Sequence, residues 1–249
     1  MMARIARFVP AVMGGGVVAV PLWSKVNAVA AANQVGQWRV AEASGTQAVD
    51  SSAQANHGTH SNVTLAVAGP DGLTVGSYAS TPSFTNVYSS ALNSDFNGQE
   101  GAAIVLAKVS AAGILADGLT HYLFRFRVSS SNYVHALLTN TTLSCLYRAG
   151  GVSSQINVTS LTAGILVNNW FIVFLTWSLS NNAFSVMLNG AQQGSTLTSL
   201  GTWSGNLATT TTCVGAQDTS GGSYWDGLLG RCTIWNTPVS LAIGATLVL

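Results

Sequence analysis

Residues 170–190 have the sequence WFIVFLTWSLSNNAFSVMLNG, which indicates two neighbouring β-strands. The first part, 170–178, is continuously apolar, as expected for a strand in the middle of a sheet or covered on both faces. The second part, 183–190, ends in Asn189-Gly190, a dipeptide that favours the tight turn of a β-hairpin. The segment therefore predicts an antiparallel sheet with a buried strand at 170–178.

Short strands of the same kind follow one another along most of the chain. Turn-rich segments of Gly, Ser, Thr and Asn separate them, and no long stretch has helical periodicity. Such spacing predicts an all-β sandwich or barrel rather than alternating β–α units. The predicted strands are 35–40, 72–79, 102–109, 121–128, 133–139, 142–148, 153–160, 170–178, 183–190, 210–216 and 228–236.

The composition predicts a neutral surface rich in hydroxyl and amide groups. Charged residues make up 7% of the chain, against about 25% in an ordinary globular domain. The net charge of +1 attracts neither phosphate backbones nor anionic lipid, so nucleic-acid binding is not expected. Arg125 and Arg127 share one face of a predicted strand, and the other basic residues are scattered. Uncharged strand edges favour a protein that works as an oligomer or within a larger assembly.

Residues 1–34 differ in character from the rest and are predicted to form a separate segment. Two arginines precede an apolar run from Phe8 to Trp23, followed by Ala28-Val29-Ala30. As a helix this run would be roughly 24 Å long, too short to span a bilayer. One interpretation is an uncleaved arm that docks on other structural subunits. The alternative is a secretory signal that is cleaved after about Ala30. In both cases the sandwich occupies residues 35–249.

Three stretches, taken in order, resemble the laminin-G-like and concanavalin A-like lectin-glucanase superfamily. They are VGQWRVAEASGTQAVDSSAQANHGT (35–59), NNWFIVFLTWSLSNNAFSVMLNGAQQGS (168–195) and CVGAQDTSGGSYWDGLLGRCTIWNTPVS (213–240). The resemblance implies a two-sheet antiparallel jelly-roll sandwich that binds glycans or proteins. It also implies the settings in which such modules are common, secreted proteins and bacteriophage virions.

Turn residues fit such a sandwich. Asp50 and Asp226 are expected in turns, because an aspartate can accept a hydrogen bond from the backbone two residues further on. Gly45, Gly190 and Gly227 are expected where the backbone needs a positive φ.

The acidic residues argue against an enzyme. Glucanases of the superfamily carry clustered carboxylates, and glycoside hydrolysis needs two of them about 5–10 Å apart. Here no two acidic residues are closer than five positions, and no nucleophile elbow, P-loop or zinc-protease motif is present. The acidic residues are Glu42, Asp50, Asp71, Asp95, Glu100, Asp117, Asp218 and Asp226. A divergent glycoside hydrolase remains as an alternative.

No cofactor is predicted. His57 and His60 lie near a single acid, Asp50, and are expected in a solvated loop rather than around a metal. Calcium needs six to eight oxygen ligands, and Asp218 and Asp226 are the only weak candidates for such a site. The cysteines Cys145, Cys213 and Cys232 are expected to be buried thiols. A Cys213–Cys232 disulfide stays open as an alternative.

Aromatic residues in polar loops are the predicted glycan contacts, because their rings combine an apolar face with a polar group. These candidates are Trp203, Tyr224, Trp225, Phe84 and Tyr88. For Trp203 and Trp225 an equal alternative is that they cover an end of the sandwich. Four tryptophans that fall on predicted strands, Trp38, Trp170, Trp177 and Trp235, are expected in the core.

The function expected from these observations is that of a surface structural or adhesion protein, on a virion or outside a cell. Its arm would bind other subunits, and its sandwich would bind cell-surface glycans. The alternative is a secreted or cell-surface carbohydrate-binding module whose leader is removed. An arm that stays attached distinguishes the first hypothesis from the second.

Overall fold

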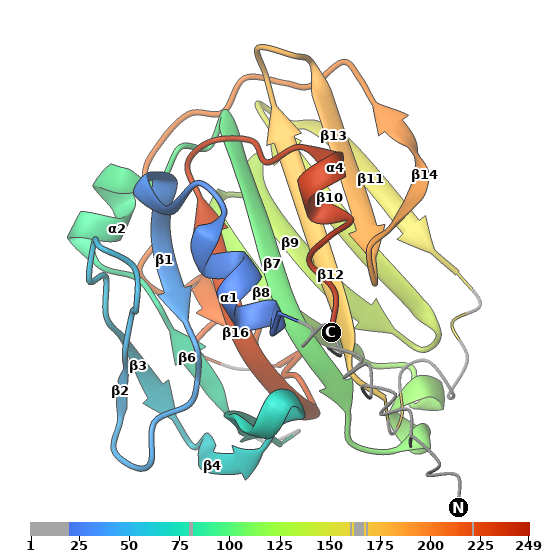
Figure 1. Cartoon of the computed structure of the whole chain (residues 1–249). Coiled ribbons are helices and arrows are strands. Elements are labelled where there is room, and N and C mark those ends of the chain that lie inside the picture. Colours follow the sequence, from blue (N-terminus) through green and yellow to red (C-terminus); the bar gives the residue numbers. More distant parts are fainter. Residues whose placement is uncertain (1–19, 80–81, 160, 162–166, 168, 221) are drawn as a thin grey trace, which may run out of the picture.

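Two antiparallel sheets of eight strands pack face to face, as the sequence predicts (Figure 1). The computed structural model describes residues 20–79, 82–159, 161, 167, 169–220 and 222–249. Sheet A has the strand order β14-β13-β12-β7-β16-β5-β4, with β1 paired to β16, and sheet B has the order β11-β10-β9-β8-β15-β6-β3-β2.

The strands of sheet A are β1 (Gln34–Trp38), β4 (Thr64–Ala68), β5 (Thr74–Tyr78), β7 (Glu100–Val109), β12 (Phe171–Ser178), β13 (Ala183–Leu188), β14 (Ala191–Leu197) and β16 (Gly227–Trp235). Those of sheet B are β2 (Gln47–Ala48), β3 (Gly58–Ser61), β6 (Phe84–Asn86), β8 (Thr120–Ser129), β9 (Asn132–Thr139), β10 (Thr142–Ala149), β11 (Val152–Val158) and β15 (Thr212–Val214). The α-helices are α1 (Leu22–Ala28), α2 (Ser90–Asp95) and α4 (Leu241–Gly244), and short 3-10 helices span Ala31–Asn33, Pro70–Gly72 and Ala112–Ala116.

The hairpin predicted at residues 183–190 is confirmed. Strand β13 turns at Asn189 and Gly190, whose φ angles are 50° and 77°, and continues into β14. Gly45 and Gly227 also have positive φ, as predicted, with angles of 100° and 149°. Strand β12 lies between β7 and β13, and its alternate side chains pack in the main core and in a second apolar cluster, so both of its faces are covered.

Strands β2, β3, β4, β6 and β14 were not predicted from the sequence. Four of them have five residues or fewer, too short for a clear alternation of polar and apolar positions. The fifth, β14, is exposed or half-buried at every position because it lies at the edge of sheet A. Its sequence, AQQGSTL, therefore lacks the apolar face that identifies a strand.

The main hydrophobic core fills the space between the sheets. Trp38 and Trp177 lie fully inside it, as predicted. Trp235 is also fully buried, but it belongs to a second apolar cluster on the outer face of sheet A. Trp170 packs against this second cluster and is half-buried.

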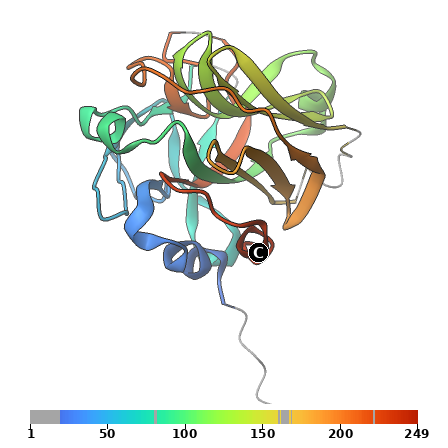
Figure 2. The same cartoon turned by 90° about the horizontal axis from the view of Figure 1, so that it is seen from above.

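Helix α1 covers the outer face of sheet A together with the C-terminal segment around α4. Figure 2 shows α1 and α4 on one side of the sandwich and strands β8–β11 on the opposite side. Leu22 and Val26 of α1 are 2% and 1% exposed. Trp235 Nε1 donates a hydrogen bond of 2.9 Å to the Val29 carbonyl. The Arg39 guanidinium carbon lies 3.4 Å from the centre of the Trp23 ring. The folded domain thus includes Leu22 and the residues after it. The sequence predicts instead that residues up to 34 form a separate segment.

The three cysteines are buried free thiols. Cys213 lies on β15 in sheet B and Cys232 on β16 in sheet A, so the two belong to different sheets. None of the described helices is long and apolar enough to cross a membrane.

Candidate functional site

Two of the predicted glycan contacts, Trp203 and Trp225, lie inside the protein. Trp203 is 6% exposed, and its ring centre lies 6.0 Å from that of Tyr147 and 5.6 Å from that of Phe96. Trp225 is fully buried against Phe171. Neither ring offers a face to a sugar, so this part of the prediction is corrected. Their loops are polar, but the two rings pack into the core. This agrees with the alternative that they cover an end of the sandwich.

Of the other three predicted contacts, Tyr224 is also buried, and Phe84 on β6 and Tyr88 just after it are half-buried. Tyr224 is 7% exposed, and its carbonyl accepts a hydrogen bond of 2.8 Å from His121 Nδ1. With Trp203 and Trp225 in the core, the five predicted residues do not form one exposed face.

A different set of side chains gathers on the outer face of sheet B. In the register of β8 and β9, Arg125 is opposite His135, and Arg127 is opposite Tyr133. The alternate residues between them, Phe124, Phe126, Val134 and Ala136, point into the main core. We call Tyr122, Arg125, Tyr133 and His135 the Arg125 cluster.

A β-bulge brings Tyr122 into this cluster. Residues 122 and 125 are an odd number of positions apart, and in a regular strand they would point to opposite faces. The register of β8 shifts between Tyr122 and Phe124, so that Tyr122 is opposite Leu137 and Phe124 is opposite Ala136. The extra residue places the Tyr122 side chain on the same face as Arg125.

Arg125 and His135 are packed between the two tyrosine rings. The Arg125 guanidinium carbon lies 5.5 Å from the ring centre of Tyr122 and 5.4 Å from that of Tyr133. The His135 ring meets Tyr122 edge-on at 5.3 Å and stacks on Tyr133 at 5.4 Å. The aromatic rings therefore attract the cation through their faces and hold the imidazole in place.

Both polar side chains of the cluster are buried without enough hydrogen-bond partners. Arg125 is 6% exposed and His135 is 7% exposed. Arg125 Nε and Nη1 and His135 Nδ1 have no hydrogen-bond partner among the residues that the structure describes. Each such atom costs about 1–3 kcal/mol when it stays unsatisfied. A group that supplies the missing hydrogen bonds would thus be bound favourably.

Burial controls the charge of these groups. Burial, together with the charge of Arg125, lowers the pKa of His135 to about 3, so the imidazole is neutral at physiological pH. One of its ring nitrogens is then a donor and the other an acceptor. Burial also lowers the pKa of Arg125, but a guanidinium stays protonated in proteins. The cluster therefore offers one cation and one neutral imidazole.

The sequence contains a partial signal for this cluster. The sequence predicts that Arg125 and Arg127 share one face of their strand. It does not predict that this strand pairs with 133–139. Register across that hairpin is what brings His135 and Tyr133 beside the two arginines.

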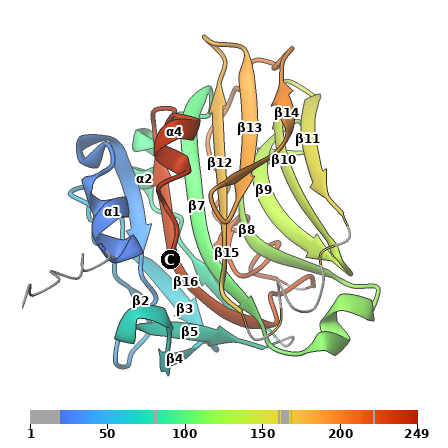
Figure 3. The same cartoon turned by 45° about the vertical axis from the view of Figure 1, so that its right-hand side comes forward.

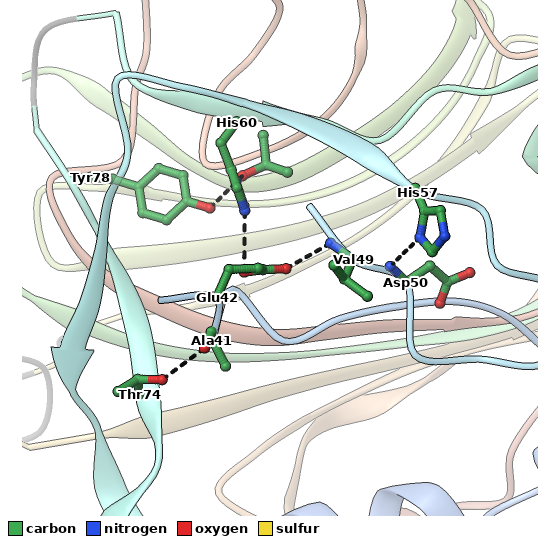
Figure 4. A network of polar contacts seen from close by, with 9 residues as sticks. Ala41, Glu42, Val49, Asp50, His57, His60, Thr74 and Tyr78 are labelled. Carbon is green, nitrogen blue, oxygen red and sulfur yellow. Dashed lines mark hydrogen bonds and ion pairs between the residues drawn. The ribbon is translucent and has the colours of Figure 1, made fainter. Parts of the chain in front are cut away.

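A second polar network joins Glu42, His60, Thr85 and Tyr78 (Figure 4). Tyr78 Oη lies 2.7 Å from Thr85 Oγ1, and His60 Nδ1 lies 2.9 Å from the same hydroxyl. His60 Nε2 lies 3.3 Å from Glu42 Oε2, and the Val49 amide donates to Glu42 Oε1 at 2.6 Å. Burial raises the pKa of Glu42, but the hydrogen bonds from His60 and Val49 outweigh it and hold that pKa below its ordinary value.

This network links neighbouring strands and is not a candidate ligand site. If Nε2 carries the proton, each contact from Tyr78 through Thr85 and His60 to Glu42 has one donor and one acceptor. A cavity of about 230 Å³ lies beside Glu42 and is also lined by Arg39, Ala41, Val49 and Ser51. The prediction of a solvated loop was wrong for His60, which is 4% exposed. His57 is exposed, and its Nδ1 accepts the Asp50 amide proton at 3.0 Å.

The weak calcium candidates are engaged in separate hydrogen bonds. Asp218 Oδ1 accepts from the amide and the hydroxyl of Ser220, and Asp226 accepts from the Ser110 hydroxyl. Asp50 caps its own turn as predicted, since its Oδ1 accepts from the Ser52 amide at 2.8 Å. Among the residues that the structure describes, no three His, Cys, Asp or Glu side chains are grouped as metal ligands.

Several solved structures have a similar fold. One is the botulinum neurotoxin serotype D binding domain, with a TM-score of 0.63 and 13% identity over 87% of this chain and 51% of that one. This chain thus spans about half of that domain. Another is domain 4 of AbnA, a GH43 extracellular arabinanase from Geobacillus stearothermophilus, in complex with arabinotriose. Its TM-score is 0.61, with 10% identity over 87% of this chain and 98% of that one.

A third is the CBM40 of the Ruminococcus gnavus IT-sialidase, with a TM-score of 0.54 and 10% identity over 87% of this chain and 100% of that one. At these identities the likeness shows the fold alone. No curated protein matches the sequence. The model of one protein family, a laminin-G-type family, matches residues 88–242, which are more than half of the chain. The protein therefore belongs to the concanavalin A-like lectin/glucanases superfamily.

Proposed function

We propose that this protein is a non-enzymatic binding domain that takes a glycan on the outer face of sheet B. The observation that carries the proposal is the Arg125 cluster, in which buried polar atoms without partners lie between two aromatic rings. Sugar recognition combines a ring that packs on an aromatic face with hydrogen bonds that fix its orientation. The cluster contains both kinds of group.

The strands beside the cluster extend this polar surface. On β10 and β11, Ser144 is opposite Asn157, and Gln155 Nε2 donates 2.8 Å hydrogen bonds to Ser144 Oγ and to Asn157 Oδ1. Gln155 and Asn157 are exposed. Amides and hydroxyls in a row next to aromatic rings suit a ligand with many hydroxyl groups.

The carboxylates support a binding rather than a catalytic role. Glu42, Asp50 and Asp117 accept hydrogen bonds from amides, hydroxyls or histidines within the protein. A glycosidase needs two carboxyl groups facing one substrate bond. The arabinotriose-bound arabinanase domain and the sialidase CBM40 give further support, as domains of the same fold.

A glycan microarray of neutral and charged oligosaccharides, followed by calorimetry on the binders, tests the proposal. Replacing Tyr133 by Ala removes a ring of the cluster and is expected to abolish binding. The matched control is Tyr88→Ala, which removes a half-buried ring outside the cluster. Loss of binding in the Tyr88 variant alone would instead support the face predicted from the sequence. No binding to any glycan would contradict the proposed function.

We further propose that the domain acts on a surface assembly, a virion or an extracellular structure, with its N-terminal segment attached. The supporting observation is that α1 packs on sheet A through Leu22 and Val26. Cleavage after Ala30 would remove Leu22 and Val26 from the apolar cluster on the outer face of sheet A. Intact mass and light scattering on the protein from its natural source test this point. A monomer that lacks about thirty N-terminal residues would support the secreted module instead.

A further inference from the structure

Positive charge is concentrated on the outer face of sheet B. The hundred residues from 118 to 217 contain no Asp or Glu, and their three basic residues are Arg125, Arg127 and Arg148. Arg125 and Arg127 lie on β8, and Arg148 lies on β10. In a chain with only nine Lys and Arg residues, a third of the basic side chains thus lie on two strands that flank β9.

The strand register places these arginines around the tyrosine of the cluster. Tyr133 on β9 is opposite Arg127 on one side and Arg148 on the other. His135, two residues further along the same face, is opposite Arg125. Arg127 and Arg148 are half-buried, and Arg148 Nε donates to the Gly151 carbonyl at 3.2 Å.

Among the residues that the structure describes, no ion pair joins a carboxylate to these arginines. The two ion pairs found in the described part of the chain join His60 to Glu42 and His121 to Asp117. The negative charge of Asp218 interacts electrostatically with Arg125. Asp218 also accepts a hydrogen bond from the Ser220 amide in its own turn. The local balance is therefore three positive charges against one negative charge.

A neutral sugar would complete the hydrogen bonds of Arg125 but not compensate its charge. Burial of a cation is costly unless an anion or a set of strong dipoles balances it. Hydrogen bonds between a guanidinium and an anionic oxygen are roughly twice as strong as those between neutral groups. Because His135 is neutral, it can bond to the same ligand without adding another buried charge.

We propose that the Arg125 cluster selects glycans that carry a negatively charged group, a carboxylate or a sulfate, over neutral glycans with the same backbone. Arg125 binds the anionic group, the Tyr133 ring packs against the sugar, and Arg127 and Arg148 attract the ligand from solution. This inference rests on the proposed glycan-binding function and names the ligand class of that site.

The test uses an array of matched pairs on which only the charge differs. The pairs are sialylated glycans and their sialic acid methyl esters, oligogalacturonates and their methyl esters, and sulfated and unsulfated galactan oligomers. The full-length protein is expected to bind charged members at least about tenfold more tightly, with an affinity that falls as salt concentration rises. Comparison of the carboxylated with the sulfated pairs identifies which anion is preferred.

Three variants locate the effect. Arg125→Gln is expected to weaken binding to charged glycans roughly ten- to a hundredfold and to abolish the preference for them. Arg127→Gln replaces a half-buried residue and serves as the second variant if Arg125→Gln fails to fold. The matched control Lys108→Gln removes one positive charge from β7 of the opposite sheet and is expected to bind like the wild type.

The outcomes separate this inference from the function on which it rests. Equal or tighter binding of the neutral members would overturn the charge selectivity but leave glycan binding intact. Selectivity that survives in both arginine variants would overturn the assignment to this site. If no glycan binds, both proposals fail, and binding only to phosphatidylserine vesicles would replace them with a lipid surface.

Discussion

At the scale of single residues, Arg125 and His135 lie in surroundings that disfavour their charged forms. Both are more than nine-tenths buried, and together they leave three polar nitrogen atoms without partners. Such residues reduce the stability of the unliganded protein. A loss of stability of this kind is common at binding sites. Stability and binding should therefore respond in opposite directions to substitutions here.

Replacing Arg125 by Met should separate the two properties. A buried charge exchanged for an apolar side chain of similar length is often neutral or stabilising. We expect the free energy of unfolding without ligand to stay the same or to rise by up to roughly 2 kcal/mol. Binding to glycans should be lost. Urea unfolding without ligand measures the first effect, and a fall of several kcal/mol would indicate that Arg125 has a structural role instead.

His135 predicts a pH dependence of stability. Its pKa is about 3 in the folded protein and about 6.5 in an unfolded chain. Between these values the unfolded chain binds the proton and the folded protein does not, so stability falls as the pH decreases below about 6.5. Arg125, Tyr122 and Tyr133 are the charged and titratable groups that face the ring.

Urea unfolding of the wild type and of His135→Gln at several pH values tests this dependence. Between pH 6.5 and 5 the wild type should lose roughly 2 kcal/mol more than the variant, at about 1.4 kcal/mol per pH unit. Acidic groups titrate in both proteins, and the comparison removes their contribution. Parallel curves for the two proteins would contradict the prediction.

At the scale of secondary-structure elements, α1 is the feature that extends the sandwich beyond its two sheets. Its buried side chains complete an apolar cluster with Ile104, Ile172 and Phe174 on the outer face of sheet A. Figure 3 shows α1 and α4 next to the strands of this sheet. A helix of seven residues is not stable by itself, so its packing against the sheet holds it in place.

Leu22→Ala should therefore destabilise the whole domain. Leu22 is 2% exposed, and a Leu-to-Ala change in a core costs about 2–5 kcal/mol. The control Ser24→Ala changes an exposed residue of the same helix and should stay within about 0.5 kcal/mol of the wild type. Thermal or urea unfolding distinguishes the two, and equal stability would show that α1 is only loosely attached.

At the scale of the whole molecule, the sandwich leaves strand edges without charges. The edge strands β14 and β4 of sheet A and β11 and β2 of sheet B contain no Asp, Glu, Lys or Arg. Proteins usually protect such edges with charges, bulges or prolines. Strands β4 and β14 both carry register irregularities and β2 has two residues, so the seven-residue strands β14 and β11 are the longest of these edges available for pairing.

We expect the domain to associate through β14, and a lysine on that strand should weaken the association. Ser195 lies on β14 and is exposed. Ser195→Lys should reduce self-association at least about tenfold in light scattering, because pairing would bury the added charge. Ser94→Lys on α2 adds the same charge away from the edges and is the control. A wild type that stays monomeric at every concentration would contradict the prediction.

Part of the candidate site can be predicted from the sequence. Alternation along 121–128 is enough to place Arg125 and Arg127 on one face. The position of Tyr122 was not predictable in this way, since it depends on a bulge that the pattern shows only as an irregularity. Trp203 and Trp225 were misplaced because their polar loops resemble exposed loops, while long-range contacts with Tyr147 and Phe171 bury the rings.

Local sequence patterns are enough to predict the all-β sandwich, the buried strand at 170–178 and the turn at Asn189-Gly190. These features depend on neighbouring residues: the alternation of side chains along a strand and the backbone preference of a turn. The positions of Tyr133 and His135 beside Arg125, and of α1 on sheet A, become visible in the folded structure. Strand register and helix docking come from contacts between distant segments, and no local pattern encodes them.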